Sequence, residues 1–273
     1  MKKIFLSTVM AISAINAFAQ KDSTMLSVTY ETTFQMFEED DSISRDMSRL
    51  DIGEKSSQFI SMVSEWFSKN NDKSTAKEQR QHSPYVGYKS FRYSVYKNMP
   101  EQGIVSVIHM PGWVTVQDTI SSLFDWKLEE GDTIICEYPC KKATTTFRGR
   151  DWTVWYTLDI PYNDGPWRFG GLPGLILSAR ESEGIFSFNA VGIEKGNGHS
   201  FEFPAYKKKK VVTPKRAEEL MILEGEDNDA YMSLMTGFQM KTTAVYDANG
   251  NPVPIVPKHV VLIERTSKKA KKK

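Results

Sequence analysis

Residues 143–157 read ATTTFRGRDWTVWYT, and this stretch decides the fold class. Its two ends, Ala143–Phe147 and Trp152–Thr157, have the composition of β-strands. Between them lies Arg148-Gly149-Arg150, a short turn with a central glycine. Two strands joined by such a turn are typical of an antiparallel hairpin. The stretch therefore predicts an antiparallel sheet.

The same pattern continues on both sides of this hairpin. From Leu26 to Met36, mostly apolar residues alternate with mostly polar ones, which indicates a strand with one buried face. Turn residues such as Pro111-Gly112 and Glu130-Gly131 separate further strand-like runs. These shorter strands are predicted at 47–52, 58–61, 91–95, 104–108, 113–116, 124–128, 175–179, 185–191 and 260–264.

Two segments break the strand pattern and predict helices. Apolar residues at helical spacing begin at Met62, and the pattern fades into a polar loop by residue 81. Thr213 and Pro214 are typical of the N-cap and first position of a second helix, continuous or broken near Gly225. Strands outnumber helices and the two types do not alternate regularly. We expect a mostly β (α+β) fold, a curved antiparallel sheet or half-barrel with one or two covering helices.

The N-terminus has the organisation of a cleavable signal peptide. Lys2 and Lys3 precede an apolar run over 4–15, and Ala17-Phe18-Ala19 supplies small residues for cleavage before Gln20. The alternative is a membrane anchor, but the run is shorter than the ~20 residues that span a bilayer. We expect a signal peptide at 1–19, a single β-rich domain at 20–266 and a disordered lysine-rich tail at 267–273.

Composition and charge narrow the function classes. The chain has 273 residues, of which 40% are hydrophobic and 25% charged, and its net charge is +1. These values are typical of a globular protein, and near-neutrality argues against a nucleic-acid partner. No segment after the signal peptide predicts a transmembrane helix. We expect a periplasmic or outer-membrane-associated protein, and the sequence does not indicate an oligomeric state.

Residues Gly171–Ile176 read GLPGLI. Together with Phe-Arg-Gly-Arg at 147–150 and Trp-Tyr-Thr at 155–157, this hexapeptide resembles the GLPGLI family (Porphyromonas-type) of secreted Bacteroidota proteins. That resemblance implies export and no established biochemical activity. Many members carry a second Cys where this chain has Thr144-Thr145-Thr146. The resemblance therefore does not extend to any disulfide that those members share.

The hexapeptide itself predicts a structural turn. Pro173 presets its own φ angle and Gly174 accepts a positive φ, which together favour a type II turn. Gly171 allows the backbone to pass close to another element. A phosphate cradle is disfavoured because Pro173 lacks an N–H and a strand follows it. We expect a fixed loop over the sheet, with Trp167 and Leu172 as plugs.

Five residues near this loop are the candidate ligand-binding side chains: Arg150, Trp155, Trp167, Leu172 and Pro173. The aromatic content of 12% suits an ordinary core better than a cavity wall, but it also motivates the hypothesis of an apolar pocket on the concave face. Trp152 and Trp155 have opposite parity on one strand and should point to opposite faces. Arg150 suits an anion or a solvated position.

We therefore expect an exported, non-enzymatic binding or accessory protein without a cofactor. Its ligand or partner would be an apolar molecule such as a lipid, a peptide or an outer-membrane protein. One alternative is a hydrolase with an unrecognised active site, since no known catalytic motif occurs and pairs such as Asp159 and Asp164 are common in loops. The other is a metal-binding periplasmic protein, for instance through His109-Met110 and Cys136.

Cys136 and Cys140 would lie ~13 Å apart on a straight strand, beyond disulfide reach. Only a bend at Tyr138-Pro139 would join them, so both free thiols and a strained disulfide stay open. Two lysine runs, 207–210 and the tail, suit either an anionic envelope surface or ordinary solvation.

Overall fold

The computed structural model of the chain describes residues 21–40, 42–70, 83–109, 114–196, 198–204, 210–246 and 251–266. The predicted signal peptide, the lysines at 207–209 and the tail at 267–273 lie outside these residues. No helix in the described ranges is long and apolar enough to cross a membrane.

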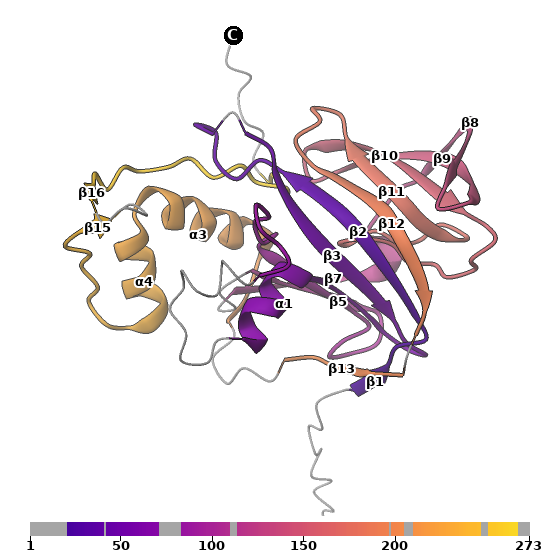
Figure 1. The fold of residues 1–273 in the computed structure, drawn as a ribbon, viewed down its shortest axis with the longest axis horizontal. Helices are drawn as coiled ribbons and strands as arrows, with labels where there is room; N and C mark the ends of the chain where they lie inside the picture. Colours follow the sequence, from indigo (N-terminus) through magenta and orange to yellow (C-terminus); the bar gives the residue numbers. More distant parts are fainter. Residues whose placement is uncertain are drawn as a thin grey trace, which may run out of the picture.

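One curved sheet dominates the described part of the chain (Figure 1). All neighbouring strands are antiparallel except the first pair, and the sheet is open, with β14 and β8 at its edges. This confirms the predicted mostly β fold and corrects one point, because the sheet is mixed. Its twelve strands, in spatial order, are β14 (Lys210–Val212), β7 (Val114–Thr119), β6 (Ile104–His109), β5 (Tyr93–Lys97), β4 (Ser57–Ser61), β3 (Ser44–Ile52), β2 (Leu26–Phe34), β12 (Ser187–Lys195), β11 (Leu175–Glu181), β10 (Arg150–Thr157), β9 (Tyr138–Phe147) and β8 (Lys127–Ile135).

The predicted hairpin at 143–157 is confirmed as β9 and β10. Phe147 pairs with Arg150, and the two turn residues Arg148 and Gly149 have φ angles of 43° and 75°. Positive φ at both central residues is the geometry of a type I′ turn, whose twist matches that of the flanking strands. Cys136 and Glu137, at 48° and 70°, form the same kind of turn between β8 and β9.

The helices begin where the sequence predicts. Ser61 caps α1 (Met62–Lys69) by accepting from Ser64 N at 3.0 Å, and Thr213 caps α3 (Pro214–Glu226) by accepting from Arg216 N at 3.2 Å. Asp227 ends α3 and caps α4 (Asn228–Thr236), so of the two possibilities that the sequence left open, the structure has two helices, broken at Asp227.

A few predicted strands differ from the structure. The run at 124–128 becomes strand only from Lys127, and β8 then continues past Gly131 through an irregularity between Glu129 and Asp132. The strand predicted at 260–264 is wrong, because this segment forms only one bridge, Val260 to Phe37. Short pairs were not predicted: β1 (Lys21–Ser23) with β13 (Ser200–Glu202), and β15 (Val245–Tyr246) with β16 (Pro252–Val253). A 3₁₀ turn, η1, covers Ile120–Ser122.

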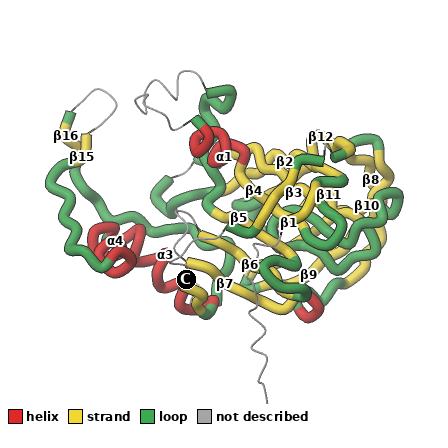
Figure 2. The backbone as a smooth tube through the Cα atoms, turned by 90° about the horizontal axis from the view of Figure 1, so that it is seen from below, coloured by secondary structure: helices red, strands yellow, loops and turns green. Residues whose placement is uncertain are grey.

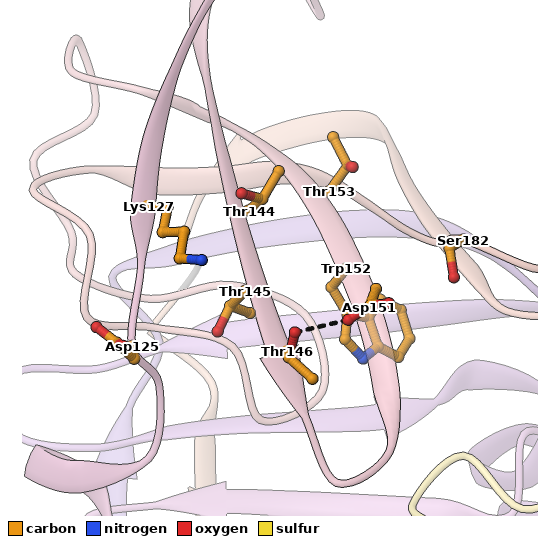
Figure 3. A pocket seen from close by; sticks show the side chains of 9 residues that line it. All are labelled: Asp125, Lys127, Thr144, Thr145, Thr146, Asp151, Trp152, Thr153 and Ser182. Carbon is orange, nitrogen blue, oxygen red and sulfur yellow. Dashed lines mark hydrogen bonds between the residues drawn. The ribbon is translucent and has the colours of Figure 1, made fainter.

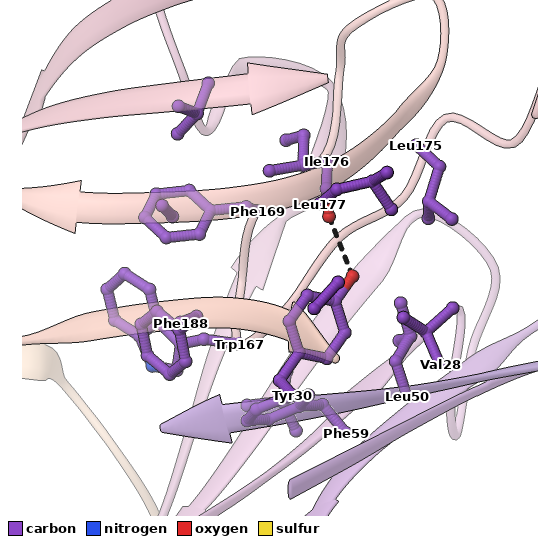
Figure 4. Packing of buried hydrophobic residues seen from close by; sticks show 14 of the residues in the cluster. Val28, Tyr30, Leu50, Phe59, Trp167, Phe169, Leu175, Ile176, Leu177 and Phe188 are labelled. Carbon is purple, nitrogen blue, oxygen red and sulfur yellow. Dashed lines mark hydrogen bonds between the residues drawn. The ribbon is translucent and has the colours of Figure 1, made fainter. Parts of the chain in front are cut away.

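The concave side of the sheet is filled by side chains (Figure 4). The loop between β10 and β11 places Trp167 and Phe169 there, in ring contact with Trp152 and with one another. Tyr30 closes the core by donating from its hydroxyl to Ile176 O at 2.7 Å. The core therefore lies where an apolar ligand pocket was expected.

The last described residues, 258–266, form the C-terminal strap. Val261 N donates to Met36 O at 3.0 Å, and Ile263 is fully buried in the core. In Figure 1 the strap returns from β16 past α3 to the sheet. It therefore fixes both α3 and the loop between β10 and β11 to the body of the protein.

Candidate functional site

The GLPGLI hexapeptide forms a different turn from the one predicted. Gly171 takes the positive φ, at 92°, whereas Gly174 is outside the left-handed region. Gly174 is required for another reason: a Cβ there would lie 1.9 Å from Thr157 O. The loop is also held from outside, since Trp126 Nε1 donates to Gly170 O at 2.8 Å. The hexapeptide thus holds a loop against β10, as its sequence indicates. It does so through the close packing of Gly174 and not through the predicted type II turn.

The five candidate ligand-binding residues do not converge on one cavity. Trp167 and Leu172 are buried in the same core, with 0% and 2% exposure. Pro173 is exposed at the surface. Trp155 is half-buried on the opposite face from Trp152, as its parity predicts, and its indole covers Gly131 of β8.

Arg150 is buried and binds protein groups. Its Nη1 contacts Glu181 at 2.9 Å, and its Nε and Nη2 donate to Leu262 O at 3.0 and 2.7 Å. Burial, followed by the nearby charge of Arg265, lowers the pKa of Arg150 from its ordinary value. The guanidinium thereby joins β10 to the C-terminal strap.

The other arginines of this region hold the strap in the same way. Arg148 and Arg168 share two carboxylates, Asp118 and Glu264; Arg168 contacts them at 2.6 and 2.5 Å. Burial acts to raise the pKa of Glu264, but the charges of Arg168 and Arg148 lower it below its ordinary value. Glu264 is therefore the ionised centre of a buried network, and the arginines serve the fold.

A buried lysine fixes the loop from the other side. Lys97 of β5 donates from Nζ to the Asp164 carboxylate, to Gly165 O at 2.7 Å and to Phe169 O at 2.6 Å. Sequence reasoning missed Lys97, because a lysine inside one strand carries no motif. Asp164 is thus ion-paired and Asp159 is exposed, so these two carboxylates do not face each other across a cleft.

A groove of about 770 Å³ lies on the opposite face of the sheet, between β2–β4, α1 and the chain around β13. Asp51 is fully buried at its floor and accepts hydrogen bonds from Arg49 Nε at 2.9 Å, Gln58 Nε2 at 2.8 Å and Ser27 Oγ at 2.9 Å. His199 Nε2 lies 3.6 Å from the same carboxylate. The groove is therefore lined by a histidine that lies close to a buried carboxylate from a residue 148 positions earlier in the chain.

Arg49 links this pair to a second carboxylate. Its Nη1 donates to Glu65 Oε2 at 2.8 Å, and Lys69 donates to Glu65 at 2.9 Å. Burial acts to raise the pKa of Glu65, but these hydrogen bonds lower it below the ordinary value. Glu65 is therefore ionised at neutral pH, and the half-exposed His199 places its Nε2 3.2 Å from Thr24 Oγ1.

A smaller groove of about 360 Å³ crosses β8–β10 (Figure 3). Lys127, Thr144 and Thr153 line it, and Thr146 Oγ1 donates to Asp151 Oδ1 at 2.6 Å. The lining is mainly hydroxyls and charges, so this groove suits a solvated polar surface better than an apolar ligand.

Exposed apolar side chains concentrate in the C-terminal lobe, defined here as residues 214–257. Figures 1 and 2 both show α4, β15 and β16 standing to one side of the sheet. The lobe is attached where Val114 and Val116 of β7 pack against Ala217 and Leu220 of α3. The exposed large apolar residues in the lobe are Ile222, Leu234, Phe238, Met240, Val245, Val253, Ile255 and Val256.

Cysteine and histidine chemistry is sparse in what the structure describes. Cys136 and Cys140 are free thiols, so they do not form the strained disulfide that their spacing had left open. Burial raises the pKa of Cys140 to about 11, and that of His109 falls to about 4 for the same reason. Within the described ranges, no three His, Cys, Asp or Glu side chains gather as metal ligands.

Comparisons with known proteins extend this description. Residues 148–178, from the hairpin turn through most of β11, match the family model "Protein of unknown function (Porph_ging)". No curated protein matches the chain. Two solved structures, "Structure of PNGF-II in C2 space group" and "Structure of PNGF-II in P21 space group", align with TM-scores of 0.46 and 0.44 at 17% identity. The alignments cover 73% and 74% of this chain but 32% and 33% of those chains, so the chain spans about a third of their length.

Proposed function

We propose that this protein is an exported cell-envelope protein of the GLPGLI family that acts by binding a partner through its surface. The signal-peptide organisation of residues 1–19 supports export. The match of residues 148–178 to a Porphyromonas-type family model supports the family, since it includes the hexapeptide.

The observation that carries the binding role is the cluster of exposed apolar residues on the C-terminal lobe. Phe238 is 74% exposed, and Ile255 and Val256 are 60% and 65% exposed. Exposed apolar side chains are costly in water, and where they gather in one region of a soluble protein they mark an interaction site. The concave face offers no comparable site, because Trp167 and Phe169 fill it. Binding through the lobe therefore replaces the pocket expected beneath Trp167 and Leu172.

The lobe also holds these residues in defined positions. Asp229 accepts from Thr242 N and Thr242 Oγ1, both at 2.6 Å, and Ser233 Oγ accepts from Met240 N at 2.8 Å. The chain after α4 is therefore folded back along the helix with Phe238 at its tip. Pro252, Pro254 and Pro257 stiffen the returning segment, which lowers the entropy lost on binding.

The test is native mass spectrometry of the mature protein isolated from its own envelope, compared with the variant F238S/I255S/V256S. We expect a bound partner on the parent protein and a bare mass for the variant, with unchanged circular dichroism. A matched control, V191S, removes an exposed apolar residue from β12, outside the lobe. Equal partner binding by the parent and the triple variant would contradict the proposal.

A second candidate function, a hydrolase, is favoured by the His199–Asp51 pair in the 770 Å³ groove. A histidine close to a buried carboxylate is a candidate general base. The candidate predicts that mature protein hydrolyses at least one member of an ester, amide and glycoside panel, and that H199Q abolishes that activity. Activity unaffected by H199Q would remove this groove from consideration.

A further inference from the structure

Strand β8 forms a free edge of the large sheet. Within the described ranges it pairs with β9 alone, and Figure 1 shows it at the outer margin of the sheet. Seven of its nine residues are exposed, and the side chains of Leu128 and Ile134 are among them, at 67% and 74% exposure. The strand is therefore open to solvent along most of its length.

The register of the β8–β9 hairpin determines which backbone groups of β8 face outward. A two-residue turn is closed by a hydrogen-bonded pair, here Ile135 with Tyr138. Pairs alternate along an antiparallel ladder, so the next pair, Ile134 with Pro139, is not hydrogen-bonded. Pro139 has no N–H, which agrees with this assignment. The N–H and C=O groups of Ile134, and those of Asp132 two residues earlier, therefore point away from β9 to the free edge.

The side chains on this part of β8 form two rows that continue onto β9. Ile135 is half-buried against the core, so Ile134 and Asp132 lie on the opposite, solvent-exposed face. Asp132 lies opposite Lys141, and Ile134 lies opposite Pro139. One row is thus a base beside an acid, and the other is apolar. A further strand with a base beside Asp132 and an apolar residue beside Ile134 would extend both rows favourably.

The charge of β8 argues against a second copy of this chain as the added strand. The strand contains Glu129, Glu130 and Asp132 but only one base, Lys127. Like charges on adjacent strands destabilise the pairing, so two β8 edges would repel each other. The irregularity between Glu129 and Asp132 also limits regular pairing to residues 132–135. The edge therefore suits a short basic segment of another protein.

We propose that the β8 edge over residues 132–135 binds an extended segment of a partner protein that carries a basic and an apolar side chain two residues apart. The segment would add a thirteenth strand to the sheet. Main-chain hydrogen bonds to Asp132 and Ile134 would supply affinity, and the two side-chain rows would supply specificity. Figures 1 and 2 both show β8 on the far side of the sheet from the C-terminal lobe, so this site goes beyond the proposed function.

The test is the exchange of backbone amide hydrogens with solvent, read residue by residue by NMR. The probe is the peptide acetyl-Lys-Thr-Val-Thr-Lys-amide, whose two lysines flank the valine so that either strand direction fits. We expect the amides of Asp132 and Ile134 to exchange about ten-fold more slowly at roughly ten times the dissociation constant of the peptide. The amides of Thr133 and Ile135 point to β9 and serve as internal controls. Unchanged exchange at Asp132 and Ile134 would overturn the proposal.

Two altered peptides separate the contribution of the backbone from that of charge. Methylating the valine nitrogen removes the hydrogen bond to the carbonyl oxygen opposite it, and we expect the slowed exchange to be lost. Replacing both lysines with glutamate places acids beside Asp132, and we expect at least several-fold weaker binding. Equal binding of all three peptides would show that neither the ladder nor the charge row recognises the segment, and would refute the assignment.

A charge-reversal variant locates the site on the protein. D132K should weaken binding of the parent peptide several-fold. D159K is the matched control, because Asp159 is equally an exposed acid but lies in the loop between β10 and β11. Equal weakening by both variants would mean general electrostatic attraction, which contradicts a site on β8. Slower exchange at Asp132 and Ile134 on raising the concentration of the protein alone would mean pairing between copies, and would also overturn the proposal.

Discussion

Arg150 donates two hydrogen bonds, at 3.0 and 2.7 Å, to the carbonyl oxygen of Leu262, a residue 112 positions later in the chain. The same guanidinium contacts the buried carboxylate of Glu181 at 2.9 Å. One side chain thus connects the middle of the sheet to the C-terminal strap.

Replacing Arg150 should therefore release the C-terminal strap and leave the buried charge of Glu181 without a partner. We expect R150M to lose about 3–5 kcal/mol of unfolding free energy, since it leaves Glu181 without its partner. Urea denaturation would measure the loss. The control is R180M, which removes an exposed arginine from the neighbouring strand β11. A loss for R150M no larger than for R180M would contradict the structural role.

Gly174 tests the close contact made by the hexapeptide. A Cβ at this position would lie 1.9 Å from Thr157 O, so G174A must displace β10 or the loop. We expect a loss of about 3 kcal/mol or more by thermal or chemical denaturation. G192A is the comparison, because a Cβ there meets nothing nearer than Thr29 Cβ at 4.0 Å. Similar effects of the two substitutions would argue against this packing.

Lys97 and Asp164 should behave as a coupled pair. K97M leaves the Asp164 carboxylate without its cation, and we expect a loss of about 3–5 kcal/mol. The double variant K97M/D164N removes both charges and should recover part of that loss. A double-mutant cycle of unfolding free energies measures the coupling. Strictly additive losses would mean that the two side chains act independently.

Asp46 should make stability depend on pH. It is fully buried, and burial raises its pKa to about 7, although Phe91 N donates to it at 2.7 Å. A folded-state pKa above the unfolded value of 3.8 means that the folded state favours the protonated form. This contribution is fully present below about pH 4 and is lost as the pH rises through about 7.

The variant D46N isolates this contribution because Asn does not titrate. Between pH 4 and pH 8 the parent protein should lose a few kcal/mol relative to D46N, at about 1.4 kcal/mol per pKa unit. Unfolding free energies at several pH values give the comparison. Parallel pH profiles for the two proteins would show that Asp46 keeps an ordinary pKa.

Local patterns were sufficient for the parts of the fold that local physics determines. The hairpin turn at Arg148-Gly149 and the helix start at Thr213-Pro214 both appear where predicted, because turn and cap geometries depend on neighbouring residues. The strand predicted at 260–264 failed for the converse reason. Its partner is only the short segment after β2, so its β-forming residues pack into the core without a ladder.

The candidate sites depended on contacts that sequence spacing does not contain. Arg150 looked like an exposed turn residue because Leu262 and Glu181 are distant in sequence. Trp167 looked like a ligand-facing side chain, whereas its ring packs against Phe147, Trp152 and Phe169 in the core. The pairing of His199 with Asp51 had no local signal at all.

The pairing of β2 with β12, in which Thr32 lies opposite Phe188, determines when the molecule can fold. A chain that emerges N-terminus first exposes β2 with no partner on one side until about 150 further residues have followed it. Such non-local pairing slows folding, because a long loop must close before the contacts that compensate its entropy can form. Until β12 pairs with β2, the incomplete sheet exposes unpaired strand edges, which are prone to aggregation. We therefore expect chaperone binding to matter most before β12 has been synthesised.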